Sequence, residues 1–261
     1  MQEKEEQLRA ILRKLEGVTV AFSGGVDSTF LLYMAREELG SNVLAVTACG
    51  SLYPAGEAEE ASRLAAALCV PHLLIRSPLP GDASFDDNPP ERCYICKKII
   101  FSYLQEEAQR RGRYQVVDGT NADDCKLYRP GLKALEELGV LSPLKMAGLT
   151  KEEIRSLSRK NKLPTWNRPP SPCLATRFPY GESITLDKLE TVKCAESSLA
   201  LHDLGPLRVR YHREVARLEI PEEKFEQVLA KKDKIISLVK KAGFKFVALD
   251  LQGFRSGSFD E

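Results

Sequence analysis

Hydrophobic and polar positions follow two alternating periods along the first half of the chain. Apolar residues recur at helical spacing from Leu8 to Leu15, which predicts an amphipathic helix within residues 3–16. Compact apolar runs predict buried strands, and the amphipathic segments between them predict helices. The strands are expected at Val18–Phe22, Asn42–Cys49, His72–Ser77 and Tyr114–Asp118, and the helices at Ser28–Leu39, Gly56–Leu68 and Tyr94–Arg111. Strands that alternate with helices indicate an α/β fold with a doubly wound, mostly parallel sheet, whose ligands bind at the carboxyl ends of the strands.

The pattern changes in the second half of the chain. Thr150 and Glu153 have the spacing of a capping box, so a helix is expected to begin there. Residues 163–180 contain five prolines and predict a long irregular loop, a kind of segment that often carries function. A smaller α+β domain is expected from about Ile184, with helices at Asp187–Leu201 and Glu222–Lys241 and strands at Leu207–Tyr211, Ala216–Ile220 and Lys245–Asp250. The predicted division is an ATP-binding domain (1–165), a Pro-rich catalytic loop (166–182) and a C-terminal domain for substrate binding and oligomerisation (183–261).

The charge balance limits the classes of partner. Among 261 residues, 38 Lys and Arg face 37 Asp and Glu, so no global attraction for nucleic acid or an anionic membrane is expected. The N-terminal segment lacks the apolar core of a signal peptide, and the longest apolar runs, such as Val43–Ala48, are too short to span a membrane. We therefore expect a cytoplasmic protein, in which the seven cysteines stay reduced and clustered cysteines have metal-binding or catalytic roles.

The strongest motif is the Ser-Gly-Gly-Val-Asp-Ser segment Ser23–Ser28, between a predicted strand and a predicted helix. Glycines let the backbone approach a phosphate closely, and amides at a helix N-terminus bind the anion. Asp27 would repel a bare phosphate, which indicates a bridging Mg²⁺. An ordinary strand-to-helix turn is the alternative. The motif lacks the Gly-Lys ending of the Walker A loop and instead resembles the signature of the PP-loop ATP pyrophosphatases, which cleave ATP between the α- and β-phosphates to adenylate another molecule.

A second glycine loop, Asp118–Asn121, follows another predicted strand. Because the carboxyl ends of parallel strands meet at one edge of a sheet, this loop is expected beside the first one. A plain turn is the alternative, and the resemblance to the superfamily favours ATP binding.

Three cysteines lie in sequence contexts that suggest a metal-binding or catalytic role. Cys93 and Cys96 form a C-x-x-C pair at the start of a predicted helix, and Cys173 lies in the Pro-rich loop. A redox pair lacks a thioredoxin-like context, and a zinc site lacks a second ligand pair. The three could instead hold an iron–sulfur cluster with one iron left open for a substrate or a sulfide. The alternative is that Cys93, Cys96 and Cys173 have no shared role. The other four cysteines are interpreted as packing residues: Cys49, Cys69, Cys125 and Cys194.

Taken together, the motifs resemble one family over essentially the whole chain: LarE, the ATP-dependent sulfur transferase of nickel-pincer cofactor synthesis. The matching segments are Ser23–Ser28, Asn88–Lys97, Asp118–Asp124, Tyr128–Gly131, Pro172–Arg177 and Arg208–His212. The resemblance implies ATP and Mg²⁺ as cofactors, and adenylation of the carboxylates of pyridinium-3,5-biscarboxylic acid mononucleotide before their conversion to thiocarboxylates. In one branch the sulfur comes from the cysteine matching Cys173. The additional Cys93 and Cys96 suggest the branch that uses a [4Fe-4S] cluster held by all three cysteines.

The resemblance also implies roles for individual residues. The catalytic residues would be Cys173, Asp27 and Arg177, and the ATP-binding residues Ala21, Ser23, Gly24, Gly25, Asp27, Ser28, Thr47, Gly119, Thr120 and Asn121. Arg208, Arg210 and Glu196 are expected to bind the substrate, and Glu196 matches a family acidic residue proposed to bind metal near it. Lys97 and Arg177 are weaker candidates for anion contacts. Arg208 and Arg210 would share one strand face, where guanidinium groups match oxyanions. Solvated surfaces are the alternative for these Arg and Glu residues. The family also implies a homo-oligomer such as a hexamer.

Three other functions fit parts of the sequence. A tRNA thiolase of the same superfamily also combines a PP-loop with cysteines, but the net charge of +1 and the lack of a zinc-ribbon terminus disfavour it. A non-catalytic nucleotide-binding or iron–sulfur protein would keep the phosphate loop and release no pyrophosphate. An ammonia-using synthetase would leave the three cysteines without a purpose.

Overall fold

The computed structural model describes residues 1–112, 115–126 and 130–255 and divides the chain into two compact units. The N-terminal unit comprises Met1–Gly50, Gly56–Pro78 and Glu91–Ser171, and the C-terminal unit comprises Ser51–Ala55, Leu79–Pro90 and Pro172–Glu261. Tyr114, Tyr128 and Arg129, which the sequence analysis placed in a strand or a family motif, lie outside the described residues, and so does the side chain of Cys125.

A four-stranded parallel sheet forms the centre of the N-terminal unit, in the order β3-β2-β1-β4. The strands are β1 (Val18–Ala21), β2 (Val43–Cys49), β3 (His72–Arg76) and β4 (Gln115–Val117). In the register, Val18 lies opposite Val43 of β2 and Gln115 of β4. The predicted parallel α/β architecture is confirmed, and β1 and β4 deliver the two glycine loops to the same edge of the sheet.

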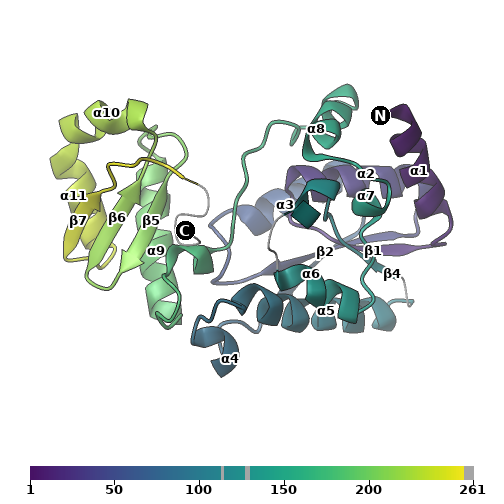
Figure 1. Ribbon diagram of the computed structural model, residues 1–261, viewed down its shortest axis with the longest axis horizontal. Helices are drawn as coiled ribbons and strands as arrows, with labels where there is room; N and C mark the ends of the chain where they lie inside the picture. The colour runs from purple at the N-terminus through teal and green to yellow at the C-terminus, as the bar shows by residue number, and fades with distance from the viewer. Residues whose placement is uncertain (113–114, 127–129, 256–261) are drawn as a thin grey trace. The chain divides into compact units, whose positions relative to one another are not determined.

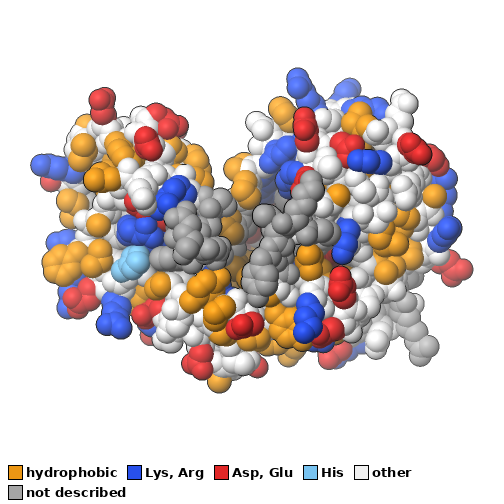
Figure 2. All heavy atoms as spheres, in the orientation of Figure 1, with side chains coloured by type: hydrophobic (Ala, Val, Ile, Leu, Met, Phe, Trp, Pro, Cys, Tyr) orange, Lys and Arg blue, Asp and Glu red, His pale blue; other side chains and the backbone are white. Residues whose placement is uncertain are grey.

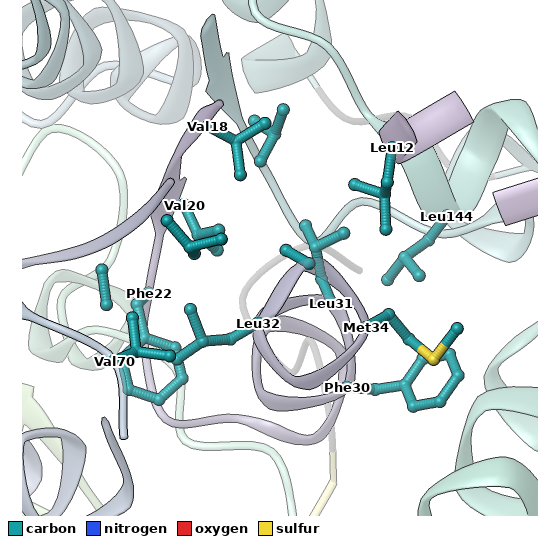
Figure 3. Packing of buried hydrophobic residues seen from close by; sticks show 14 of the residues in the cluster. Leu12, Val18, Val20, Phe22, Phe30, Leu31, Leu32, Met34, Val70 and Leu144 are labelled. Atoms are coloured by element: carbon teal, nitrogen blue, oxygen red, sulfur yellow. The ribbon is translucent and has the colours of Figure 1, made fainter. Parts of the chain in front are cut away.

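Helices cover both faces of this sheet (Figure 1). One face carries α1 (Gln2–Arg13), α2 (Val26–Leu39), α3 (Glu57–Ala67), α7 (Pro143–Met146) and α8 (Lys151–Lys160), and the other carries α5 (Arg92–Arg110) and α6 (Pro130–Glu137). Figure 3 shows Val18 and Val20 of β1 in the same apolar cluster as Phe30 to Leu32 of α2. These side chains are fully buried, so the helix that follows the phosphate loop is firmly packed.

The C-terminal unit contains a three-stranded sheet, β5-β6-β7. Its strands are β5 (Arg208–His212), β6 (Val215–Glu219) and β7 (Phe246–Leu249), with an antiparallel first pair and a parallel second pair. Val209 lies opposite Leu218, and both are buried on one face; Arg208 lies opposite Glu219 on the other face. The helix α9 (Leu186–Ala200) contacts β5 and α11 (Lys232–Lys241). The expected small α+β fold is therefore present.

Several elements differ from the sequence prediction. The single helix predicted at Glu222–Lys241 is wrong, because the segment divides into η3 (Glu222–Lys224), α10 (Phe225–Ala230) and α11. The helices α10 and α11 run in different directions (Figure 1), so that Val228 and Ile235 are each buried from a separate helix. Burial of both side chains overrides the helical propensity of the intervening lysines. The short α4 (Ala83–Asp86), α6, α7 and the 3₁₀ turn η1 (Ala122–Lys126) were not predicted.

On the face that Figure 2 displays, basic and acidic side chains are interspersed. No helix within residues 1–112, 115–126 and 130–255 is both long and apolar enough to cross a membrane.

The predicted capping box of α8 is confirmed and gives a stability prediction. Thr150 accepts from the Glu153 amide, Glu153 accepts from the Thr150 amide (2.9 Å), and Lys4 Nζ lies 2.8 Å from Glu153 Oε2. The hydrogen bond from Lys4 holds the pKa of Glu153 below its ordinary value. Because glutamine keeps the capping acceptor and loses only the ion pair with Lys4, we expect Glu153→Gln to lower the free energy of unfolding by about 0.5–1 kcal/mol at neutral pH.

Because the folded pKa of Glu153 is lowered, its stabilisation is present at neutral pH and is lost as the pH falls through that pKa. Urea unfolding at pH 7 and near pH 3 should therefore show a difference between variant and wild type that shrinks in acid. Glu152→Gln, on the exposed side of the same helical turn, is the control and should change little. A difference for Glu153→Gln that is equal at both pH values would contradict the prediction.

Candidate active site

The phosphate loop is a tight turn whose serine hydroxyls lie together. Gly24 has a φ of +69°, and a Cβ added there would lie 3.4 Å from Leu64 Cδ1 of α3. Ser23 Oγ lies 3.1 Å from Ser28 Oγ, and the Gly25 amide donates to Ser23 Oγ (3.3 Å). Gly25 is the N-cap of α2, so the loop combines helix N-terminal amides with two hydroxyl groups. This arrangement suits a phosphate or pyrophosphate.

The second glycine loop lies against the first. A Cβ added to Gly119 would lie 3.0 Å from Ser28 N, so only glycine allows this close approach of the two backbones. Asn121 Nδ2 donates to Asp27 Oδ1 (3.3 Å). The structure thus brings together the residues that the sequence assigned to two separate loops.

Asp118 organises the second loop. Its buried carboxylate accepts from Thr120 Oγ1 (2.5 Å) and from Ser142 Oγ (2.5 Å), and Lys97 Nζ of α5 lies 3.9 Å from Asp118 Oδ2. These contacts fix the backbone of residues 118–121 at the sheet edge. Lys97 therefore contacts this loop from the helix turn that carries Cys96.

Lys151 is a charged neighbour that the sequence analysis did not identify. Its ammonium group forms an ion pair with Asp27, and its amide donates to Asp123 Oδ2 (2.9 Å). The two partners of the ion pair are 124 residues apart in the chain. The capping box predicted where α8 begins, but a local pattern contains no information about which distant side chain this helix end meets. The lysine partly neutralises the acid within a loop whose amides and hydroxyls suit an anion.

Ala21 and Thr47 lie on the two central strands beside the phosphate loop. Ala21 is the last residue of β1, and Thr47 is in β2. Thr47 Oγ1 donates to Phe22 O (2.6 Å) and lies 2.8 Å from His72 Nε2. Burial lowers the pKa of His72, which favours the neutral ring. The Thr47 hydroxyl therefore helps to hold the end of β1 in place.

The three cysteines of interest belong to different units. Cys93 is exposed and Cys96 is half-buried, one turn apart on α5 and thus on neighbouring positions of the helix surface. Cys173 is half-buried in the C-terminal unit, directly before the 3₁₀ turn η2 (Leu174–Arg177). Within either unit, the described part of the chain holds no group of three or more His, Cys, Asp or Glu side chains arranged to bind a metal ion.

Two segments from the first third of the chain hold the loop around Cys173. The backbone hydrogen bonds run from Leu174 N to Leu52 O (2.8 Å), from Gly181 N to Asn88 O (3.0 Å) and from Ile184 N to Asp86 O (2.8 Å). Asn88 is buried with a φ of +53°, which asparagine tolerates better than most residues, and its Nδ2 donates to Pro179 O (2.7 Å). The structure therefore gives Asn88 a supporting position that its place in a motif had not indicated.

Arg177 and Glu196 form a bidentate ion pair in the C-terminal unit. Arg177 Nε lies 2.8 Å from Glu196 Oε1, and Nη2 lies 3.0 Å from Oε2. Glu196 Oε1 also accepts from the Val209 amide (2.9 Å). Glu196 thus joins η2, α9 and β5, and the alternative of a solvated glutamate on a helix surface is wrong.

Arg208 and Arg210 are buried rather than solvated, so the alternative of a solvated strand face is also wrong. Arg210 Nη2 lies 2.8 Å from Glu219 Oε2, and Arg210 also donates to Thr176 O. Burial lowers the pKa of Arg208, and the charges of Arg210 and Arg177 lower it further. Glu219 and Glu196 offset part of this repulsion, and a bound oxyanion would add to that compensation.

The buried ion pair gives a second stability prediction. Glu219→Gln leaves the charge of Arg210 without its compensating carboxylate in the interior, so we expect the free energy of unfolding to fall by about 3–5 kcal/mol. Glu214→Gln, which removes an exposed pair with Lys245, is the control, with an expected loss of about 1 kcal/mol or less. Urea unfolding of both variants measures the difference. Equal losses would contradict the assignment of a buried pair.

These features define a class. A parallel β3-β2-β1-β4 sheet with a Ser-Gly-Gly-x-Asp-Ser loop after β1 and a glycine loop after the adjacent β4 is the arrangement of the PP-loop ATP pyrophosphatases. The chain is 28% identical over 197 residues to a GMP synthase (glutamine-hydrolyzing) of Aeropyrum pernix, covering 68% of this chain and 38% of that protein. The chain is therefore an ATP-dependent enzyme of this class.

Two relatives align over nearly the whole chain. The pyridinium-3,5-bisthiocarboxylic acid mononucleotide synthase of Lactiplantibacillus plantarum is 38% identical over 259 residues, covering 99% of this chain and 94% of that protein. An uncharacterized protein of Synechocystis sp. is 37% identical over 262 residues, covering 100% of this chain and 98% of that protein. No protein-family model matches the chain. The chain belongs to the LarE family of pyridinium-3,5-bisthiocarboxylic acid mononucleotide synthases.

Proposed function

We propose that this enzyme adenylates the carboxylates of pyridinium-3,5-biscarboxylic acid mononucleotide and converts them to thiocarboxylates, as a step in nickel-pincer nucleotide cofactor synthesis. The observation that carries the proposal is the identity of 38% with the Lactiplantibacillus plantarum synthase over 99% of the chain. Two thiocarboxylates per product require the cycle of activation and sulfur transfer to occur twice. We propose the cytoplasm as the compartment, where the cysteines would stay reduced, and a homo-oligomer as the assembly.

In the adenylation step, the phosphate loop binds the pyrophosphate part of ATP. The Gly25 amide and the hydroxyls of Ser23 and Ser28 supply hydrogen-bond donors, and Ala21, Thr47 and Gly119–Asn121 surround the rest of the nucleotide. Asp27 is the residue to hold Mg²⁺, which when bound stabilises the negative charge of the departing pyrophosphate. A carboxylate oxygen of the substrate attacks the α-phosphorus, and the bond to the β-phosphate oxygen breaks.

Substrate binding is the role that we propose for the arginines of the C-terminal unit. The planar guanidinium group of Arg208 matches a phosphate or carboxylate of the mononucleotide, and Arg210 and Arg177, which Glu219 and Glu196 hold beside it, add positive charge. Burial is the main cause of the lowered pKa of Arg208, and the charges of Arg210 and Arg177 add to it, so a bound oxyanion would stabilise the charged guanidinium group. Glu196 orients Arg177 through the bidentate contact.

For sulfur transfer, Cys93, Cys96 and Cys173 would hold a [4Fe-4S] cluster. Thiolates are the ordinary ligands of such clusters, and the open iron that three ligands leave can supply a bound sulfide. The alternative sulfur source is Cys173 itself: its Sγ attacks the acyl adenylate and displaces AMP, after which loss of the Cα proton and cleavage of the Cβ–Sγ bond leave dehydroalanine.

Anaerobic purification followed by iron and sulfide analysis tests the sulfur source. About four irons per chain with a broad visible absorbance, lost in Cys93→Ala, would establish the cluster. An iron-free protein that loses the mass of one hydrogen sulfide after reaction would establish Cys173 as the donor. Pyrophosphate release that depends on the mononucleotide tests the reaction itself, and release stimulated by tRNA alone would support the thiolase alternative.

A further inference from the structure

A contact of Arg168 with the backbone of the phosphate loop has no part in the chemistry proposed above. Arg168 Nη1 donates to Gly24 O (3.1 Å), and Nη2 donates to Glu57 Oε2 (2.9 Å). The Arg168 side chain is only 22% exposed. One guanidinium group therefore joins the phosphate loop, the first turn of α3 and the segment that follows α8, all within the N-terminal unit.

Arg168 is itself held in place by α8. Arg155 Nη1 donates to Trp166 O (2.8 Å) and Nη2 donates to Arg168 O (2.9 Å), and Arg159 lies over the Trp166 ring, 5.1 Å from its centroid. Lys151, Arg155 and Arg159 are four residues apart and share one face of the helix. This face reaches the phosphate loop at two points: Asp27 through Lys151, and Gly24 through Arg155 and then Arg168.

The bond to Gly24 O determines how the next peptide amide points. In a trans peptide the C=O and N–H groups point in opposite directions, so holding Gly24 O also fixes the direction of the Gly25 N–H. That N–H points to Ser23 Oγ (3.3 Å), on the side where the two serine hydroxyls meet. Two consecutive glycines leave this peptide unusually free to rotate, and a charged hydrogen bond from outside the loop restrains it.

We propose that Arg168 is a positioning residue that holds the phosphate loop in its anion-binding conformation, with Arg155 acting through it. The proposal deepens the proposed function, because it rests on the loop binding the pyrophosphate part of ATP. A restrained loop binds that group without a further cost of ordering the backbone. Arg168 contacts the loop carbonyl and an acidic helix turn, and it acts on ATP through the loop.

The test is calorimetric titration of MgATP and of AMP into the full-length wild type and its variants. Arg168→Ala should weaken MgATP binding by about tenfold or more, while the affinity for AMP, which lacks the pyrophosphate, changes by about twofold or less. Arg168→Lys should recover part of the loss, because a single ammonium group keeps the charge and one of the two hydrogen bonds. Arg110→Ala, which alters an exposed arginine of α5 paired with Glu107, is the control and should bind MgATP like the wild type.

The double variant tests whether Arg155 acts through Arg168. Arg155→Ala should weaken MgATP binding less than Arg168→Ala, and the combination should bind no more weakly than Arg168→Ala alone. The proposal is overturned if folded Arg168→Ala binds MgATP like the wild type, if AMP binding falls in parallel, or if the two losses add. If the wild type binds MgATP but releases no pyrophosphate with the mononucleotide, the proposed function is wrong. The ratios of MgATP and AMP affinity between variant and wild type still decide the role of Arg168 in that case.

Discussion

Asp27→Asn is expected to abolish adenylation. Asp27 lies in the phosphate loop, contacts Asn121 and Lys151, and is the residue that we propose to hold Mg²⁺ beside the pyrophosphate. Asparagine keeps the shape of the side chain and the contact to an amide, but it removes the charge that attracts the cation. We expect the rate of mononucleotide-dependent pyrophosphate release to fall by about a hundredfold or more, because charge stabilisation of the leaving group is lost.

A matched substitution separates this effect from a general loss of helix stability. Asp187 is also an acidic residue in the first turn of a helix, α9, and it is exposed. Asp187→Asn should release pyrophosphate at the rate of the wild type. The role of Asp27 as the metal ligand is refuted if Asp27→Asn keeps full activity and the same dependence of the rate on Mg²⁺ concentration.

Cys173→Ser is expected to separate the two halves of the reaction. Serine keeps nearly the same volume before η2, but its hydroxyl is neither a sulfur donor nor a thiolate ligand. Pyrophosphate release should therefore stay within about threefold of the wild type, while the thiocarboxylate product falls below detection, since the serine hydroxyl is a far weaker nucleophile than a thiolate at this position. Quantifying pyrophosphate and product by mass spectrometry in the same reaction measures both halves.

Cys194→Ser provides the control for the sulfur-transfer experiment. Cys194 is exposed on α9, and Cys69 is exposed too, so their interpretation as packing residues is wrong. Substitution of Cys194 should leave both halves of the reaction unchanged. Thiocarboxylate formation by Cys173→Ser at the rate of the wild type would exclude Cys173 both as sulfur donor and as an essential cluster ligand. Asp27→Asn, in contrast, should lose both pyrophosphate and product, because sulfur transfer requires the adenylate.

The sequence predicts the elements of the fold well where the signal is local. Buried strands such as β1 and the capping box of Thr150 appear as short patterns, and the alternation of strands and helices predicts a parallel sheet. The meeting of the two glycine loops follows from that sheet, because β1 and β4 are neighbours. The break between α10 and α11 was missed, since it depends on which side chains the rest of the unit buries.

The candidate site was predictable only in part, for the same physical reason. The spacing of glycine and serine identifies the residues of the phosphate loop in the sequence. Lys151 and Arg168, in contrast, contact that loop from more than a hundred residues away in the chain. A lysine at a helix start or an arginine within a Pro-rich loop has many possible partners, and only the packing of α8 selects Asp27 and Gly24. The burial of Arg210 against Glu219 likewise required knowledge of the strand pairing.

The hydrogen bonds that join the Cys173 loop to Leu52, Asp86 and Asn88 have a consequence for the biosynthesis of the protein. Residues 51–55 and 79–90 leave the ribosome long before their partners at 172–184 are translated, with a delay of roughly 5 to 20 s at ordinary elongation rates. During that interval the nascent chain can complete the sheet around β1, while these two segments still lack their hydrogen-bond partners. The Cys173 loop therefore forms late in synthesis, after the parallel sheet around β1, and the C-terminal unit cannot be produced complete as a fragment that starts at Pro172.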